Sequence, residues 1–252
     1  GTSGYHGTHS LYLSGTNSYA YINDALVHLF FRGEGTICMW VRPDTISGTG
    51  IADTIFTTDS NDGLSTYSRD QFFTAYQAPA GQLRWSGRGS GSFTLIGTGY
   101  LGSGSGWFGS GNQNSAGFSF IAFAWDGDTW LQWCPVQTRT WTDHRVDFDN
   151  YCSAQPISLG GRRNCQSGSL SVDRSSELWF DEITLWDKRL TITELNTLYG
   201  SGTGVDIPNF SAYSDLRGWW DMSTSNAGVV DTGCAYDQCV PTPTPTTTPT
   251  TT

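Results

Sequence analysis

The segment that most constrains the fold is residues 176–199, SELWFDEITLWDKRLTITELNTLY. Apolar or aromatic residues at Leu178, Phe180 and Ile183 have the spacing of a half-buried strand, with an irregularity after Phe180 where two carboxylates intervene. The second half of the segment predicts one short helix over about residues 192–199. A strand that leads directly into a short helix is therefore the local unit around which the remaining chain must fold.

The ends of that helix can be assigned from side-chain chemistry. Thr191 and Glu194 have the spacing of a capping box, in which each side chain accepts from the other residue's backbone amide. Leu190 and Leu195 stand where a hydrophobic staple clamps the entry of the helix. Gly200 follows the last apolar pair and predicts a left-handed C-terminal cap.

The composition favours strands and turns over most of the chain. Gly, Ser, Thr and aromatic residues dominate, whereas the chain holds only four glutamates and a single lysine, Lys188. Residues 1–240 are long enough for one β-domain with a full core. Residues 241–252 form a separate Thr/Pro-rich tail. The chain is thus predicted to be one all-β domain followed by a stalk.

The strand and helix resemble the closing unit of laminin-G-like and pentraxin-like domains, of the concanavalin-A-like lectin and glucanase superfamily. That unit often reads I-D-E-V-x-I-W-x-R-x-L-S-x-x-E-I, and the matching residues are Phe180, Asp181, Glu182, Ile183, Leu185, Trp186, Arg189, Leu190, Thr191, Glu194 and Leu195. Residues 10–22, 36–45, 118–135 and 157–162 resemble further strands of the family, although the usual Trp-His pair before the third is absent. The resemblance implies a jelly-roll sandwich of two antiparallel sheets with one short helix. It implies little about function, because the fold carries lectins, adhesive modules, enzymes and spacers.

The charge excludes several classes of partner. The formal net charge is −10, which argues against nucleic acid and against electrostatic docking on anionic membranes. The apolar runs are far shorter than the roughly 20 residues of a membrane span. The chain begins at Gly1 without Met, which fits a processed, secreted product and equally a fragment of a longer chain.

The cysteine content favours an oxidising compartment. An even number of cysteines in a chain rich in Thr, Ser and Gly suggests disulfides. Cysteines stand at Cys38, Cys134, Cys152, Cys165, Cys234 and Cys239. Six cysteines allow 15 pairings. The interpretation adopted takes Cys152–Cys165 and Cys234–Cys239 as local links, which leaves Cys38 to pair with Cys134.

The tail is typical of an O-glycosylated stalk. Alternating proline favours polyproline II, and Thr/Pro tracts are common acceptors of O-linked sugars. The acceptors would be Thr242, Thr244, Thr246, Thr247, Thr248, Thr250, Thr251 and Thr252. The alternative is an unglycosylated linker.

Asn209 begins an Asn-Phe-Ser sequon, which predicts an N-linked glycan at the surface of a secreted protein.

Loop aromatics are the candidate ligand or subunit contacts. Tyr100 and Trp107 stand in a Gly/Ser-rich stretch, and Trp141 is a further surface candidate; exposed aromatics of this kind stack on sugars or anchor subunits. The alternative is that these rings fold back as lids over the core. The consecutive Trp219 and Trp220 alternate faces, so that one belongs in the core and the other covers an edge.

A metal site is one hypothesis for a single loop. Asp59, Asn61 and Asp62 precede a glycine and offer the oxygen ligands that calcium prefers. An ordinary hairpin turn explains the same residues. No cofactor is required by any other pattern in the chain.

Catalysis is not predicted. Glucanases of this fold use two glutamates on one strand face, and no such spacing occurs. Asp181 and Glu182 are adjacent, so strict alternation would place them on opposite faces of their strand. The histidines have no nucleophile motif beside them.

The sequence favours a non-enzymatic, secreted or cell-surface structural and adhesive module, with copies of itself and covalent glycans as partners in a glycosylated fibre. The alternative is a lectin-like module that binds extracellular carbohydrate and is tethered by its Thr/Pro tail to another domain. Ordered Thr/Pro tails packed against further copies of the chain would identify the fibre module. Saturable glycan binding would identify the lectin-like module.

Overall fold

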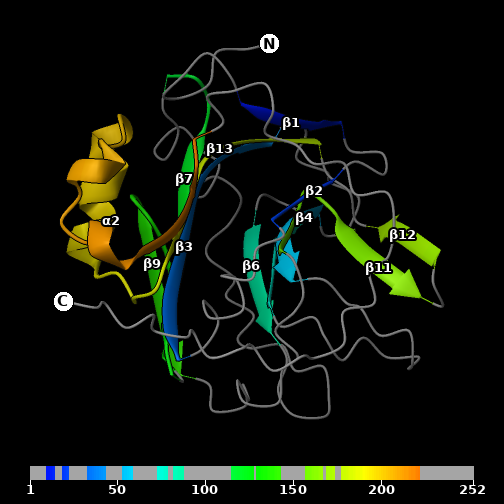
Figure 1. Cartoon of the computed structure of the whole chain (residues 1–252), viewed down its shortest axis with the longest axis horizontal. Helices are drawn as coiled ribbons and strands as arrows, with labels where there is room; N and C mark the ends of the chain where they lie inside the picture. Colours follow the sequence, from blue (N-terminus) through cyan, green and yellow to red (C-terminus); the bar gives the residue numbers. More distant parts are fainter. Residues whose placement is uncertain are drawn as a thin grey trace, which may run out of the picture.

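The computed structural model describes residues 10–14, 19–22, 33–43, 53–58, 73–78, 82–87, 115–127, 129–142, 157–166, 169–173 and 177–221. These residues form two main antiparallel sheets, with short helical segments beside one of them (Figure 1). The predicted all-β sandwich with one short helix is therefore confirmed. The Thr/Pro tail lies outside the described residues.

The larger sheet has seven strands and is built around β13 and β3. Its strands are β1 (Leu11–Ser14), β13 (Glu177–Trp186), β3 (Glu34–Pro43), β7 (Ser119–Asp126), β8 (Thr129–Cys134) and β9 (Gln137–Thr142) in spatial order, with β14 (Leu216–Trp220) also paired to β13. Strand β13 thus pairs with β3 along one side, and two short edge strands, β1 and β14, pair with different parts of its other side.

The smaller sheet has five strands and faces one side of the larger one. Its strands in spatial order are β2 (Ala20–Ile22), β10 (Ile157–Leu159), β4 (Asp53–Thr58), β5 (Phe73–Ala78) and β6 (Gln82–Gly87). A separate hairpin joins β11 (Arg162–Gln166) to β12 (Ser169–Asp173). We call the side of the larger sheet that faces these strands its inner face.

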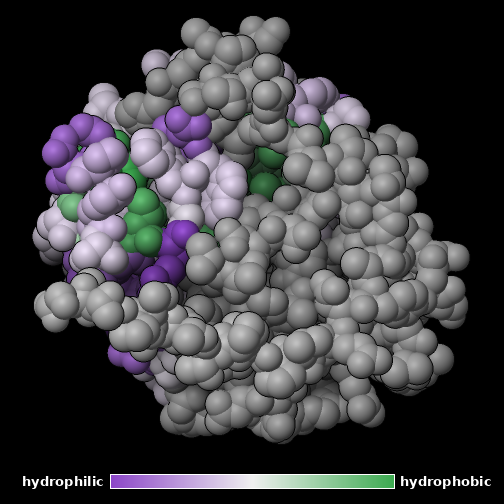
Figure 2. All heavy atoms as spheres, viewed as in Figure 1, coloured by the Kyte–Doolittle hydropathy of each residue, from purple (hydrophilic) through white to green (hydrophobic). Residues whose placement is uncertain are grey.

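Both faces of the larger sheet are apolar, as its strand sequences require. On the inner face, Ile37, Ile121 and Ile183 pack with Phe56 and Leu83 of the smaller sheet. On the opposite, outer face, side chains such as Trp40, Phe120 and Trp186 pack against the helical segments. Over the α2 side of the molecule, apolar surface is confined to small patches among hydrophilic residues (Figure 2).

The helical segments cover part of the outer face. They are α2 (Ile192–Tyr199), η2 (Gly200–Gly202), η3 (Ile207–Asn209) and η4 (Tyr213–Asp215). In Figure 1 they lie on the opposite side of the larger sheet from β4 and β6. Leu195 and Leu198 of α2 are buried against the outer face together with Ile207 and Phe210.

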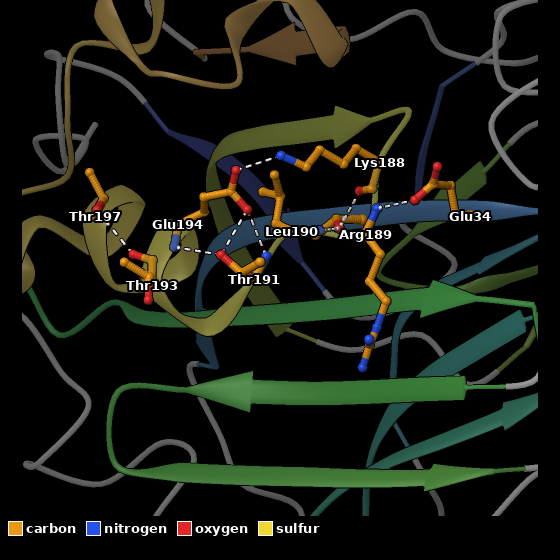
Figure 3. Close-up of polar contacts among 9 residues, drawn as sticks. Glu34, Lys188, Arg189, Leu190, Thr191, Thr193, Glu194 and Thr197 are labelled. Atoms are coloured by element: carbon orange, nitrogen blue, oxygen red, sulfur yellow. Dashed lines mark hydrogen bonds and ion pairs between the residues drawn. The ribbon is translucent and has the colours of Figure 1, made fainter.

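Both predicted helix ends are confirmed, and Figure 3 shows the contacts at the N-terminal end. The Thr191 amide donates to Glu194 Oε2 over 2.8 Å, and the Glu194 amide donates to Thr191 Oγ1 over 3.3 Å. Leu190 and Leu195 are both buried in the same outer cluster, and Gly200 adopts the left-handed conformation with φ of 56°. Each of these features is local in sequence, which is why it could be predicted.

A tertiary contact fixes the helix entry to the sheet (Figure 3). Thr36 Oγ1 donates to the Lys188 carbonyl over 2.7 Å and accepts from the Leu190 amide over 2.8 Å. Glu34 Oε2 accepts from the Arg189 amide over 3.2 Å. The start of β3 therefore holds the chain that leads into α2.

The predicted pairing of Cys38 with Cys134 is wrong, because both thiols are free. Cys38 belongs to the outer cluster and Cys134 to the inner cluster, so their side chains lie on opposite faces. Strand β7 also lies between β3 and β8, which separates the two backbones by roughly 9–10 Å, too far for a disulfide. Burial raises the pKa of both thiols, that of Cys134 to about 11.

The two local pairings, Cys152–Cys165 and Cys234–Cys239, stay predictions. Cys165 is a position on β11, and the other three lie outside the described residues. Among the described helices, none has the length and apolarity needed to cross a membrane.

Candidate functional site

A β-bulge interrupts β13 at its two carboxylates. Asp181 pairs with Trp40 and Thr184 pairs with Cys38, so two residues of β13 oppose one residue of β3. Glu182 takes up the irregularity with φ of 46°, a left-handed conformation that is uncommon for glutamate. Such backbone strain persists only where surrounding structure enforces it and clusters at functional sites.

The bulge changes which face the carboxylates occupy. Asp181 is directly opposite Trp40, whose ring belongs to the outer cluster. Glu182 lines a pocket together with Trp40 and Phe120, which are also on the outer face. The prediction that Asp181 and Glu182 point to opposite faces is therefore wrong, because the left-handed residue breaks the alternation.

Both carboxyl groups are held by hydrogen bonds. The Glu182 amide donates to Asp181 Oδ1 over 2.9 Å, and Asp181 is fully buried. Trp219 Nε1 donates to Glu182 Oε2 over 2.6 Å. The bond to the indole links the bulge of β13 directly to the edge strand β14.

Burial raises the pKa of the Glu182 carboxyl to about 7. The Trp219 hydrogen bond opposes this effect by favouring the charged form, while the negative charges of Asp181 and Asp221 add to it. The Glu182 residue is only 9 % exposed, so its carboxyl is poorly solvated when ionised. Glu182 therefore titrates near neutral pH.

The pocket at this position is small. It encloses about 270 Å³, part of which is open to solvent, between the outer face and the segment that follows α2. Its lining residues are Trp40, Phe120, Glu182, Thr184, Leu198, Gly204, Val205 and Ile207. Its enclosed part has room for about one water molecule, so it cannot itself hold a sugar or a cofactor.

Trp219 presents its ring to solvent above this carboxyl. It pairs with Thr184 on the outer face, whereas the next residue, Trp220, packs against the inner cluster. The Trp219 side chain is 38 % exposed although its indole N–H is satisfied internally. The predicted alternation of the two tryptophans is thus confirmed, and the solvent-facing one covers the edge next to the bulge.

Tyr12 is a second exposed aromatic on the same side of β13. It pairs with Trp179 on β13, and the two ring centroids lie 4.3 Å apart. The register places β1 opposite residues 177–180 and β14 opposite residues 183–186. Asp181 and Glu182 therefore stand between the two edge strands.

The contacts predicted from the sequence mostly lie elsewhere. Tyr100 and Trp107 lie outside the described residues, as do the candidate calcium ligands Asp59, Asn61 and Asp62. Trp141 is a β9 position opposite Trp130. Within the described ranges, no cluster of three or more His, Cys, Asp or Glu side chains is suited to a metal ion.

The residues that sequence reasoning passed over are Tyr12, Glu182 and Trp219. The available signal was a pair of acids inside a strand whose neighbours are apolar on both faces, since buried acids are rare without a role.

The predicted N-glycosylation residue, Asn209, is exposed at the end of η3, where Asn209 Nδ2 donates to Asp206 Oδ2 over 2.6 Å.

Comparison with known proteins shows the fold. No family model matches the sequence, and no curated protein matches it. A structure of NanB with Optactamide is similar, with a TM-score of 0.54, 16 % identity and coverage of 75 % of this chain and 27 % of that chain. A Trypanosoma rangeli sialidase in complex with 2,3-difluorosialic acid has a TM-score of 0.51, 14 % identity and coverage of 79 % and 29 %.

The binding domain of botulinum neurotoxin DC in complex with SialylT is also similar, with a TM-score of 0.50, 10 % identity and coverage of 76 % of this chain and 41 % of that chain. The chain spans well under half the length of each of these structures. The likenesses support an all-β sandwich fold, and the concanavalin-A-like assignment stays a prediction. Assignment to the laminin-G-like or pentraxin-like branch stays a prediction.

Proposed function

We propose that this domain is a non-catalytic carbohydrate-binding module in which Trp219 forms the surface that stacks on a sugar ring. The observation that carries the proposal is an exposed indole whose N–H is bonded to a buried carboxyl 2.6 Å away. Because the polar end of the ring is already satisfied, the ring face is left to make apolar contacts.

The same hydrogen bond reduces the conformational entropy that the Trp219 side chain loses when a ligand binds. A charge-assisted bond to Glu182 fixes the orientation of the indole before any ligand arrives. A side chain that is already ordered loses little conformational entropy when it contacts a ligand. Glu182 thus acts as a positioning residue for Trp219.

The local charge favours a neutral sugar. Asp181, Glu182 and Asp221 all contribute negative charge near the ring, and the whole chain carries a net charge of −10. The negative charge of these carboxylates repels the negative charge of carboxylated or sulfated sugars and so disfavours their binding. We therefore assign neutral glycans as the ligands of this chain.

A binding role fits the burial of the carboxylates better than a glycosidase role. Retaining and inverting glycosidases need two carboxyl groups about 5 to 9.5 Å apart that both reach the substrate. Asp181 is fully buried, and the pocket at Glu182 admits about one water molecule. Neither carboxyl is open to a glycosidic bond.

The similar structures support this assignment only in a general way. One neighbour is a sialidase in complex with a sialic acid derivative, and another is a binding domain in complex with SialylT. Both show that sandwiches of this shape occur in proteins that engage carbohydrate, and the ligand of this chain follows from its own residues.

Secretion and fibre assembly remain predictions from the tail. The Thr/Pro stretch and the exposed Asn209 sequon are the features that favour an extracellular glycoprotein. Residues 241–252 lie outside the described residues, so the fibre hypothesis rests on the sequence alone. Glycopeptide mapping of native material together with negative-stain imaging would test it.

Titration calorimetry tests the binding proposal. Wild type and Trp219→Ala are titrated with neutral β-1,4-linked oligosaccharides of glucose, xylose and N-acetylglucosamine, and with sialyllactose as the anionic probe. Tyr213→Ala is the matched control, since Tyr213 is an aromatic on η4 that is somewhat more exposed, at 47 %, than Trp219.

The expected result is saturable binding of a neutral series that Trp219→Ala abolishes and Tyr213→Ala retains. Absence of binding by all three neutral series at millimolar concentration contradicts the proposal. Binding that survives in Trp219→Ala contradicts the assignment of the site.

A further inference from the structure

Tyr12 is supported by a stack of side chains across the outer face. Its ring lies on Trp179 with an interplanar angle of 31°. The Arg42 guanidinium lies 4.7 Å from the Trp179 ring centroid and 5.2 Å from that of Phe118. Arg42 Nη1 also donates to the Ala116 carbonyl over 3.2 Å. Strands β13 and β3 and the segment that leads into β7 therefore contribute to one aromatic and cationic layer beneath Tyr12.

This support resembles the way Trp219 is held. The Tyr12 hydroxyl donates to Glu177 Oε1 over 3.5 Å, a weaker bond than that between Trp219 and Glu182. Tyr12 is nevertheless 40 % exposed, close to the 38 % of Trp219. Both rings are thus hydrogen-bonded to a glutamate of β13 and partly exposed to solvent.

The register places the two rings in one line. Tyr12 is opposite Trp179, which is opposite Arg42 on β3, and Trp219 is opposite Thr184, which is opposite Cys38. The four residue steps from Cys38 to Arg42 correspond to about 13 Å along the strand axis. That distance exceeds the reach of one sugar ring and suits a short oligosaccharide.

The polar bulge lies between the rings. Asp181 and Glu182 occupy the gap between β1 and β14, on the same outer face as both rings. Two separated ring surfaces match a sugar chain, which presents apolar ring faces at intervals, and the buried negative charge between them disfavours an anionic chain. A single apolar ligand would not match this pattern.

We propose that the carbohydrate site extends from Trp219 to Tyr12 and takes an extended neutral oligosaccharide rather than a monosaccharide. This inference rests on the proposed function, and it adds Tyr12 as a second stacking residue that fixes the length of the ligand. Trp219 supports binding of any length, whereas Tyr12 contributes only when the chain is long enough to reach it.

The test measures affinity against chain length. The same three β-1,4-linked neutral series, from two to six sugar units, are titrated into wild type, Tyr12→Ala, Tyr12→Phe and Trp219→Ala. In wild type the affinity is expected to rise by about tenfold once the chain spans both rings, the effect of roughly one added stacking contact. Tyr12→Ala loses this rise but keeps the affinity for the shortest ligand, and Tyr12→Phe keeps both.

The outcomes separate the two proposals. No binding of any series contradicts the proposed function. Binding that depends on Trp219 but is equal for all lengths, or a length dependence that Tyr12→Ala retains, overturns only the extended site. If Tyr12→Ala does not fold, Tyr12→Thr, which suits an edge strand, replaces it with the same expected loss.

Discussion

Glu182 makes stability depend on pH in a direction that can be tested. Its pKa is raised by burial from 4.5 to about 7 in the folded chain. Below the lower value both states are protonated and the full stability is present. As the pH rises from about 4.5 to about 7, the unfolded state ionises while burial keeps Glu182 protonated in the folded state, so stability falls, and the loss is complete once the folded state also ionises above about 7. The gap of about 2.5 corresponds to about 3 kcal/mol, since each pKa unit is worth 1.36 kcal/mol.

Glu182→Gln isolates this contribution. Glutamine keeps an acceptor oxygen for the Trp219 indole but cannot ionise. The variant is therefore expected to gain stability over wild type progressively between about pH 4.5 and pH 8, reaching about 3 kcal/mol. Other titrating groups are common to both proteins, so the difference between the two unfolding free energies reports on Glu182.

The assay is urea unfolding followed by tryptophan fluorescence, at several pH values for each protein. Trp219→Phe is a second arm, because removing the donor that favours the charged form raises the folded pKa further, so that the stability loss extends to higher pH and becomes larger. A difference between wild type and Glu182→Gln that stays constant with pH, or grows as the pH falls, would refute the reasoning.

Three further predictions concern the frame of the domain. Thr191→Ala removes the cap bonded to Glu194 and should lower the unfolding free energy by about 1 kcal/mol, measured by urea titration. Gly160→Ala should destabilise by more than the roughly 1 kcal/mol of a left-handed residue, because φ is 73° and the new methyl group would overlap Leu13; a calorimetric melt measures the loss. Cys134 should resist thiol reagents at about pH 8 until the chain unfolds, because burial raises its pKa to about 11, as peptide mapping by mass spectrometry would show.

Each of these has an outcome that contradicts it. Thr193→Ala, at an exposed helix position without a capping role, is the control for Thr191→Ala, and equal losses would show that the cap contributes nothing specific. An unchanged melting temperature in Gly160→Ala would show that the backbone relaxes at that turn. Rapid labelling of Cys134 in native protein would show that β8 opens readily.

The sequence predicted those features that depend on neighbours along the chain. The capping box of Thr191 and Glu194 and the left-handed Gly200 involve residues only a few positions apart, so their spacing alone determines the contacts. The all-β class follows in the same way from the scarcity of helix-favouring residues. The alternation of Trp219 and Trp220 was also readable, because it requires only that β14 be a strand.

Only the tertiary structure decided which distant residues meet. Pairing between β13 and β3 determines that Glu182 is a bulge residue on the outer face, and no local pattern specifies where a register shifts. The registers of β3 with β7 and of β7 with β8 place Cys38 and Cys134 on opposite faces, which rules out the disulfide that counting cysteines suggested. Tyr12 and Trp219 come from opposite ends of the described chain, and they share one face because β1 and β14 both pair with β13. Local propensity determines the elements, whereas strand register, which is set by packing over the whole domain, determines the site.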